Sequence, residues 1–180
     1  GAFSNANVGS GKTVTITSSY SGADTGNYSV TDQSSTTADI STKALTATAS
    51  ASNKTYDGST TASTTLTFSG LVGSETLGQT VGSTFDNKNV GSNKTVTVNS
   101  ITLADGSGLA VNYSISAGQT TTANITAKSL TVSGITGINK VYDGNAVVTL
   151  DSSSVTYSGL VSGDSFVGAY SGVFANANVD

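Results

Sequence analysis

The chain repeats its own sequence. The hexapeptide Phe3-Ser-Asn-Ala-Asn-Val8 returns as Phe85-Asp-Asn-Lys-Asn-Val90 and as Phe174-Ala-Asn-Ala-Asn-Val179. Two shorter motifs also recur: Tyr56-Asp57-Gly58 as Tyr142-Asp143-Gly144, and Asn27-Tyr28 as Asn112-Tyr113. The copies lie 82 to 89 positions apart. Self-similarity at a nearly constant spacing is typical of repeat architectures, so the 180 residues are interpreted as about two units of a tandem array.

Composition excludes several classes of function. The formal charge is −4 and the pI is about 4.4, so a nucleic acid would be repelled. The sequence has no Cys and no His, which removes disulfides, thiolate metal sites and the usual nucleophile–base pairs of enzymes. No stretch approaches 18 consecutive apolar residues, so we expect no membrane insertion of this segment. We therefore expect neither an enzyme nor a cofactor.

Period-two alternation predicts β-strands. It is clearest where Thr alternates with Val or Ile, at residues 12–17 and 94–98. The same pattern occurs at 45–49, 66–68, 28–30 and 113–115. Since 21 glycines and the absence of a helical apolar stripe argue against helices, the sequence predicts an all-β fold. Six or seven short strands per unit, with turn signals between them, favour β-sandwich modules.

The phase of the repeat can be set in two ways. Residues 38–45 match residues 123–130, and we interpret Ile40 as the end of one unit and Leu45 as the start of the next. On this interpretation 1–41 is the C-terminal half of a repeat, 42–127 is a complete repeat, and 128–180 is the N-terminal half of another. The joints around Lys43 and Lys128 are short and lack glycine, so we expect them to be nearly rigid. The alternative phase gives two whole modules, 1–84 and 85–180.

The recurring tyrosines and Asp-Gly pairs have a structural interpretation. Asp57-Gly58 and Asp143-Gly144 are turn signals, in which the carboxylate accepts a backbone hydrogen bond and glycine adopts positive φ. Tyr56 and Tyr142 are expected to pack against a neighbouring strand and to find a hydroxyl partner. The Asn-Tyr pairs, Asn27-Tyr28 and Asn112-Tyr113, are expected to be structural as well.

Some alternatives for these residues remain open. Asp57 and Asp143 could bind Ca²⁺ at a joint between modules, with further carboxylates from Asp24, Asp86, Asp105 and Asp164. Ca²⁺ requires six to eight oxygen ligands, whereas these residues are scattered singly, so the structural turn is preferred. A covalent cross-link from Lys54 or Lys140 to an Asn or Asp is a further alternative.

Taken together, these motifs resemble a known family. The stretches 53–58 and 139–144, the Asn-Tyr pairs and the matched stretches around Lys43 and Lys128 resemble the YDG repeat of very large bacterial surface proteins. That repeat is related to the mostly bacterial Ig-like (MBG) modules. The resemblance implies tandem immunoglobulin-like β-sandwich modules in an elongated array. It also implies an adhesin of the filamentous-haemagglutinin type, located on the outer surface of a Gram-negative cell.

Two functions follow as expectations. In the first, the repeats form a stalk that projects an adhesive region from the cell for attachment or biofilm formation, and each repeat contacts its neighbours in the same polypeptide. In the second, the repeats themselves bind glycan or polysaccharide weakly at many sites. Sugar platforms use exposed aromatic rings, and only Tyr20, Tyr157 and Tyr170 lack a recurring position.

Overall fold

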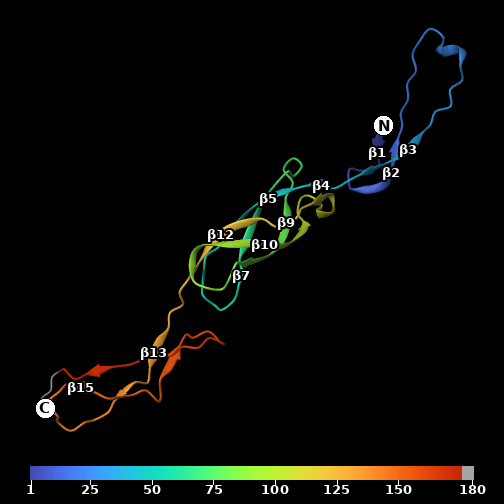
Figure 1. Cartoon of the computed structure of the whole chain (residues 1–180). Helices are drawn as coiled ribbons and strands as arrows, with labels where there is room; N and C mark the ends of the chain where they lie inside the picture. Colours follow the sequence, from blue (N-terminus) through green and yellow to red (C-terminus); the bar gives the residue numbers. More distant parts are fainter. Residues whose placement is uncertain (176–180) are drawn as a thin grey trace.

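The computed structural model describes residues 1–175 as an all-β chain with no α-helix, which confirms the predicted class. The molecule is drawn out along one direction, with the N-terminal strands near one end and β13 and β15 near the other (Figure 1). The last four residues of the third hexapeptide copy, 176–179, lie outside the described residues. The helical turns among residues 1–175 are short 3₁₀ turns, and none has the length and apolarity that a membrane span requires.

Strand pairing separates the described chain into three segments. Every strand in 1–41 pairs within that segment, and the same holds for 42–127 and for 128–175. These are called the N-terminal, central and C-terminal segments below. The pairing of β9 (Leu77–Phe85) with β10 (Gly91–Asp105) crosses the boundary that the alternative phase places after residue 84.

The N-terminal segment is a three-stranded antiparallel sheet. Its strands are β1 (Ala2–Phe3), β2 (Gly9–Thr15) and β3 (Ser35–Ile40), and β2 lies in the middle. A single 3₁₀ turn, η1 (Thr25–Asn27), interrupts the long connection from β2 to β3.

The central segment carries the largest sheet, with five strands in the order β6-β12-β10-β9-β7. Besides β9 and β10, these are β6 (Lys54–Thr55), β7 (Thr61–Ala62) and β12 (Thr120–Thr126). A separate ladder joins β5 (Thr46–Ala51) to β8 (Thr64–Ser69). The side chain of Gln79 in β9 links the five-stranded sheet to β8. Its amide accepts a hydrogen bond from the Leu66 N–H (3.1 Å) and donates one to the Leu66 carbonyl (2.7 Å).

The first and last strands of the central segment hold its two ends together. The strand β4 (Lys43–Ala44) pairs in parallel with β11 (Tyr113–Ser114), which follows the 3₁₀ turn η2 (Ala110–Asn112). The strand β6 pairs in parallel with β12. Because the chain enters and leaves the segment through paired strands, both connections to the other segments start from ordered backbone.

The hydrophobic core lies in the central segment. Val96 and Val98 are fully buried and Ile125 is 1% exposed. They belong to β10 and β12, where every second side chain faces inward. Ala62, Phe85 and Ala123 complete the buried cluster around Val96 and Ile125, and Ala51 and Tyr56 pack against it.

The C-terminal segment consists of three short antiparallel ladders. The first pairs β13 (Thr131–Ser133) with β17 (Thr156–Ser158), and the second pairs β14 (Thr136–Gly137) with β16 (Leu150–Asp151). The third pairs β15 (Val147–Val148) with β18 (Gly172–Val173). The first two correspond in register to the ladder of β5 with β8, and the third to that of β7 with β9.

Backbone geometry recurs with the sequence. Gly9 pairs with Ile40 as Gly91 pairs with Ile125, and in each strand the register shifts between this pair and the following lysine. Within the shift, Gly11 has φ 60 and Asn93 has φ 50. Asparagine tolerates this left-handed conformation better than most residues with a side chain, so the same bulge is built with either residue.

The prediction from the sequence included one strand that the structure lacks, and it gave too few strands per repeat. Tyr28–Val30, predicted to be extended and paired, follows η1 but joins no ladder. Its counterpart Tyr113–Ser114 pairs with β4 at the start of the same segment, and residues 1–41 contain no copy of β4. The central segment contains nine strands, β4 to β12, in place of the six or seven predicted, because several are only two residues long.

Candidate functional site

The Tyr-Asp-Gly turn has the same internal geometry in both copies. In the first, Oδ1 of Asp57 accepts hydrogen bonds from the Ser59 N–H (2.8 Å) and from the Lys54 ammonium (2.8 Å). Gly58 has φ 80, a conformation that favours glycine. In the second copy, Oδ1 of Asp143 accepts from the Asn145 N–H (3.1 Å) and from Lys140 (2.6 Å), and Gly144 has φ 78. The turn is therefore built from its own local contacts.

These contacts stabilise the ionised carboxylates. The hydrogen bond from Lys54, followed by those from Ser59, lowers the pKa of Asp57 to about 2. The hydrogen bond from Lys140, followed by that from the Asn145 backbone, lowers the pKa of Asp143. The Asp57 and Asp143 side chains remain about half exposed, at 55% and 49%, so solvent screens both ion pairs.

The two tyrosines of the motif differ in their surroundings. Tyr56 packs against the core, and its hydroxyl donates to Oδ2 of Asp164 in the C-terminal segment at 2.7 Å. This hydrogen bond lowers the pKa of Asp164. Lys88 lies over the Tyr56 ring, with Nζ 5.9 Å from the ring centre and 3.4 Å from Oδ1 of Asp164. Tyr142, by contrast, is 64% exposed.

The Asn-Tyr pairs differ in the same way. Tyr113 is 6% exposed; its hydroxyl accepts from the Val72 N–H at 3.1 Å and donates to Glu75. Asn112 reaches the N-terminal segment, where its Oδ1 accepts from the Val8 N–H (2.8 Å) and its Nδ2 donates to Asn7 (3.1 Å). Tyr28 is 74% exposed, and Asn27 ends η1 as Asn112 ends η2.

The carboxylates considered for Ca²⁺ do not assemble. Within residues 1–175, no group of three or more acidic side chains is placed to hold a metal ion. Asp86 is paired with Lys94 at 2.9 Å, and Asp105 accepts a hydrogen bond from the N–H of Ala110, the first residue of η2, at 2.7 Å. Asp164 faces Tyr56 and Lys88, while Asp24 precedes η1. Lysine ammonium groups and backbone N–H groups thus occupy carboxylate oxygens that a bound cation would need as ligands.

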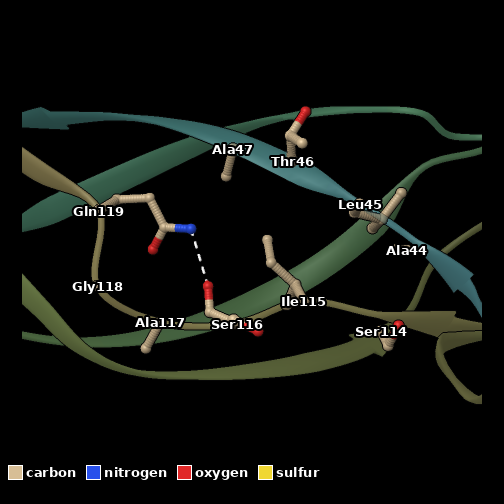
Figure 2. Close-up of a pocket in the computed structure, with 10 residues that line it drawn as sticks. All are labelled: Ala44, Leu45, Thr46, Ala47, Ser114, Ile115, Ser116, Ala117, Gly118 and Gln119. Atoms are coloured by element: carbon tan, nitrogen blue, oxygen red, sulfur yellow. Dashed lines mark hydrogen bonds between the residues drawn. The ribbon is translucent and has the colours of Figure 1, made fainter.

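A hollow lined only by uncharged residues lies on the surface of the central segment (Figure 2). It measures about 480 Å³ and lies between residues 44–47 and 114–119, where the chain diverges after the pairing of β4 with β11. Ile115 and Ala47 point into the gap, and the Gln119 amide donates to the Ser116 carbonyl at 2.8 Å. Because no aromatic ring or charge lines this hollow, it lacks the platform that sugars stack on.

The three tyrosines without a recurring position lie elsewhere. Tyr20 lies with Tyr28 in a hollow of about 530 Å³ on the loop between β2 and β3, and its hydroxyl donates to Asp32 at 2.5 Å. The hydroxyls of Tyr157 and Tyr170 lie 2.5 Å apart, and the Tyr157 ring meets Phe166 edge-on. The three rings therefore do not form one surface.

Sequence reasoning missed several members of the joints between segments. Asn7, Lys88 and Asn112 contact other segments through their side chains, and Val161 lies close to Gly58. The recurrence of Phe-x-Asn-x-Asn-Val was a usable signal, because a loop pattern that repeats within the chain without apolar alternation is more informative than a strand pattern. The partner of that loop could not be read from spacing alone.

Comparison with known families gives a result that covers nearly the whole chain. The model of the YDG domain matches residues 1–38, 41–123 and 126–180. No curated protein and no solved structure shows a significant match. The three matched stretches begin and end close to where strand pairing separates the segments, and each contains at least two of the recurring motifs described above. The chain belongs to the YDG domain family.

Proposed function

We propose that this chain is part of the stalk of a large bacterial surface adhesin, in which YDG repeats act as extenders. One observation carries the proposal: consecutive matched stretches contact each other directly, through Asn7 with Asn112 and through Tyr56 with Asp164, along a drawn-out molecule (Figure 1). Repeats that contact only their neighbours add length with each copy. An extender of this kind needs no catalytic group and no ligand.

The proposed module is an immunoglobulin-like β-sandwich at 42–127, with halves of neighbouring modules at 1–41 and 128–180. Three features support this division. The buried cluster around Val96 lies wholly inside 42–127, the first and last strands of that stretch, β4 and β12, each pair with a strand of the same stretch, and the register of the flanking segments repeats that of its two halves.

The proposed location is the outer surface of a Gram-negative cell. The sparsely charged, Ser- and Thr-rich composition and the lack of Cys support an exported fibre, because its surface stays soluble without strong self-repulsion and no disulfide can form during export. Neighbouring repeats of the same polypeptide are the proposed partners.

The cell-surface role can be tested directly. An antibody raised against residues 42–127 is expected to label intact cells of the source bacterium, and labelling only after permeabilisation would contradict the proposed location. Removing whole repeats from the parent protein, with its ends kept, is expected to reduce attachment while surface display is unchanged. Undiminished attachment by the shortened protein would contradict the extender role.

A second candidate function is weak, multivalent glycan binding. The hollow beside Tyr20 favours it, because that ring is 56% exposed and faces polar atoms of the same loop. Binding of the chain to a glycan array, lost in Tyr20→Ala, would support this candidate. No binding at high protein density would leave the extender role as the account of the chain.

A further inference from the structure

The Tyr56-Asp57-Gly58 turn presents two of its three residues to the next segment. The Tyr56 hydroxyl donates to Asp164, and a Cβ built on Gly58 would lie 2.8 Å from Cγ1 of Val161. Asp57 takes no part in this contact, since its Oδ1 is engaged by Lys54 and Ser59 within the turn. Thus Asp57 shapes the turn, while tyrosine and glycine form its outer face.

The joint between the N-terminal and central segments uses a different pair of elements. There the loop at 6–8 meets Asn112, with Val8 N–H and Asn7 Oδ1 as the contacting groups. A cavity of about 240 Å³ at this joint is also lined by Val72 and Glu75 of the central segment.

The repeat relates the two joints. Glu75 and Val72 occupy the positions that Asp164 and Val161 occupy one repeat later, after the shared Ser-Gly-Leu-Val stretches at 69–72 and 158–161. Likewise, the loop at 6–8 corresponds to that at 88–90, which includes Lys88. At each joint, the repeat nearer the N-terminus is called the leading repeat and the next one the following repeat. Both joints use the same loop of the following repeat, which we call the acidic loop (69–75 or 158–164). Both also use the Asn-x-Asn loop of the leading repeat.

From this correspondence we infer that the Tyr-Asp-Gly turn of each YDG repeat is the docking surface for the acidic loop of the following repeat. A complete joint combines this contact with the Asn-x-Asn loop against the Asn-Tyr turn of the following repeat. The occupant of the exposed turn at Tyr142 is accordingly another copy of the acidic loop, carrying Val and Glu or Asp at the positions of Val161 and Asp164. Glu75 is the acceptor for the tyrosine of a leading repeat.

Glycine is required in the turn for two separate reasons. Its φ of 80 at Gly58 and 78 at Gly144 disfavours any side chain. At Gly58, however, an added Cβ would also collide with Val161, whereas at Gly144 it would meet nothing within 4 Å. The two positions thus carry the same backbone strain and differ only in the docked loop, which makes Gly144→Ala a matched control for Gly58→Ala.

The inference extends the proposed array of repeats to the chemistry of its joints, and it can be tested within the 180-residue chain. Because the sequence has no Cys, Thr102→Cys in β10 and Thr131→Cys in β13 provide two exposed labelling sites, one in each segment and both outside the docking loop. Pulsed electron–electron spin resonance between labels at these sites measures the distance distribution across the joint. The variants are Tyr56→Phe, Asp164→Asn and their combination, with Tyr142→Phe as the control. Gly58→Ala is measured as well, with Gly144→Ala as its control.

The expected result is one narrow distance peak for the unmodified background and for Tyr142→Phe. Tyr56→Phe and Asp164→Asn are each expected to broaden it. The double variant should broaden it by less than the sum of the two effects, since both substitutions weaken the Tyr56–Asp164 contact, while Asp164→Asn also weakens the pair with Lys88. Gly58→Ala is expected to broaden the peak more than Gly144→Ala. Unchanged distributions in both Tyr56→Phe and Asp164→Asn would overturn the inference. That outcome would leave the extender role intact, because surface labelling and attachment are measured independently of any single joint.

Discussion

The ammonium of Lys54 lies 2.8 Å from Oδ1 of Asp57, and this pair occupies the centre of the turn that gives the motif its recurring sequence. Lys140 and Asp143 repeat it at 2.6 Å. A lysine three residues before the aspartate is therefore part of the motif, although the tyrosine, aspartate and glycine are its more conspicuous members.

The ion pair predicts how stability depends on pH. The pKa of Asp57 is lowered to about 2 in the folded chain, chiefly by Lys54, from an ordinary value of about 3.9 when unfolded. A lowered folded-state pKa stabilises the fold above the unfolded value and loses that effect as pH falls through the folded value. Unfolding by denaturant should therefore give constant stability from pH 7 to about 5 and a decline between about pH 4 and 2. Asp57→Asn should flatten part of that decline, and an identical decline in the variant would contradict this role.

Removal of the turn carboxylate should have a small effect that Ca²⁺ does not alter. Asp57→Ala is expected to lower the melting temperature of the chain modestly, because Ser59 and Lys54 lose their acceptor. Calorimetry with EDTA and with added Ca²⁺ should give the same melting temperature for each protein. A rise with Ca²⁺ in the unmodified chain that Asp57→Ala abolishes would mean that the turn is a metal site.

Core packing predicts unequal effects at two equivalent isoleucines. Ile125 is 1% exposed and belongs to the buried cluster, whereas Ile40, which pairs with Gly9 as Ile125 pairs with Gly91, is only half-buried. Ile125→Ala should cost about 2–5 kcal/mol of unfolding free energy, and Ile40→Ala clearly less. Urea unfolding of both variants measures the difference, and equal costs would show that the N-terminal segment is as well packed as the central one.

The division into modules predicts which fragment folds alone. Residues 42–127 contain the buried cluster and both parallel pairings that tie the ends together. Expressed separately, this fragment should unfold cooperatively, while 1–84 and 85–180 each separate β9 from β10 and should not. Cooperative unfolding of 1–84 would favour the alternative phase.

Much of the fold could be predicted because local pattern decides it. Thr alternating with Val at 94–98 places Val96 and Val98 on one face, and both are fully buried. The Asp-Gly signals likewise place positive φ at Gly58 and Gly144. These features depend on neighbours two or three residues away, which a sequence displays directly.

What could not be predicted depends on distant partners. Tyr56 and Tyr142 share one motif, yet Tyr56 is docked and Tyr142 is 64% exposed. The difference arises from Asp164, which lies 108 positions from Tyr56. Tyr28 and Tyr113 diverge for the same reason, since Val72 and Glu75 cover only the second. Spacing identifies which positions recur, but not whether the surface opposite each position is present.

The central claim is that YDG repeats add length through stiff joints. Small-angle X-ray scattering on polypeptides of two, four and six repeats tests it most directly. With joints held by direct contacts and by connections without glycine, the maximum dimension should grow almost linearly with the number of repeats. Growth with the square root of that number, as for flexibly linked beads, would contradict the account.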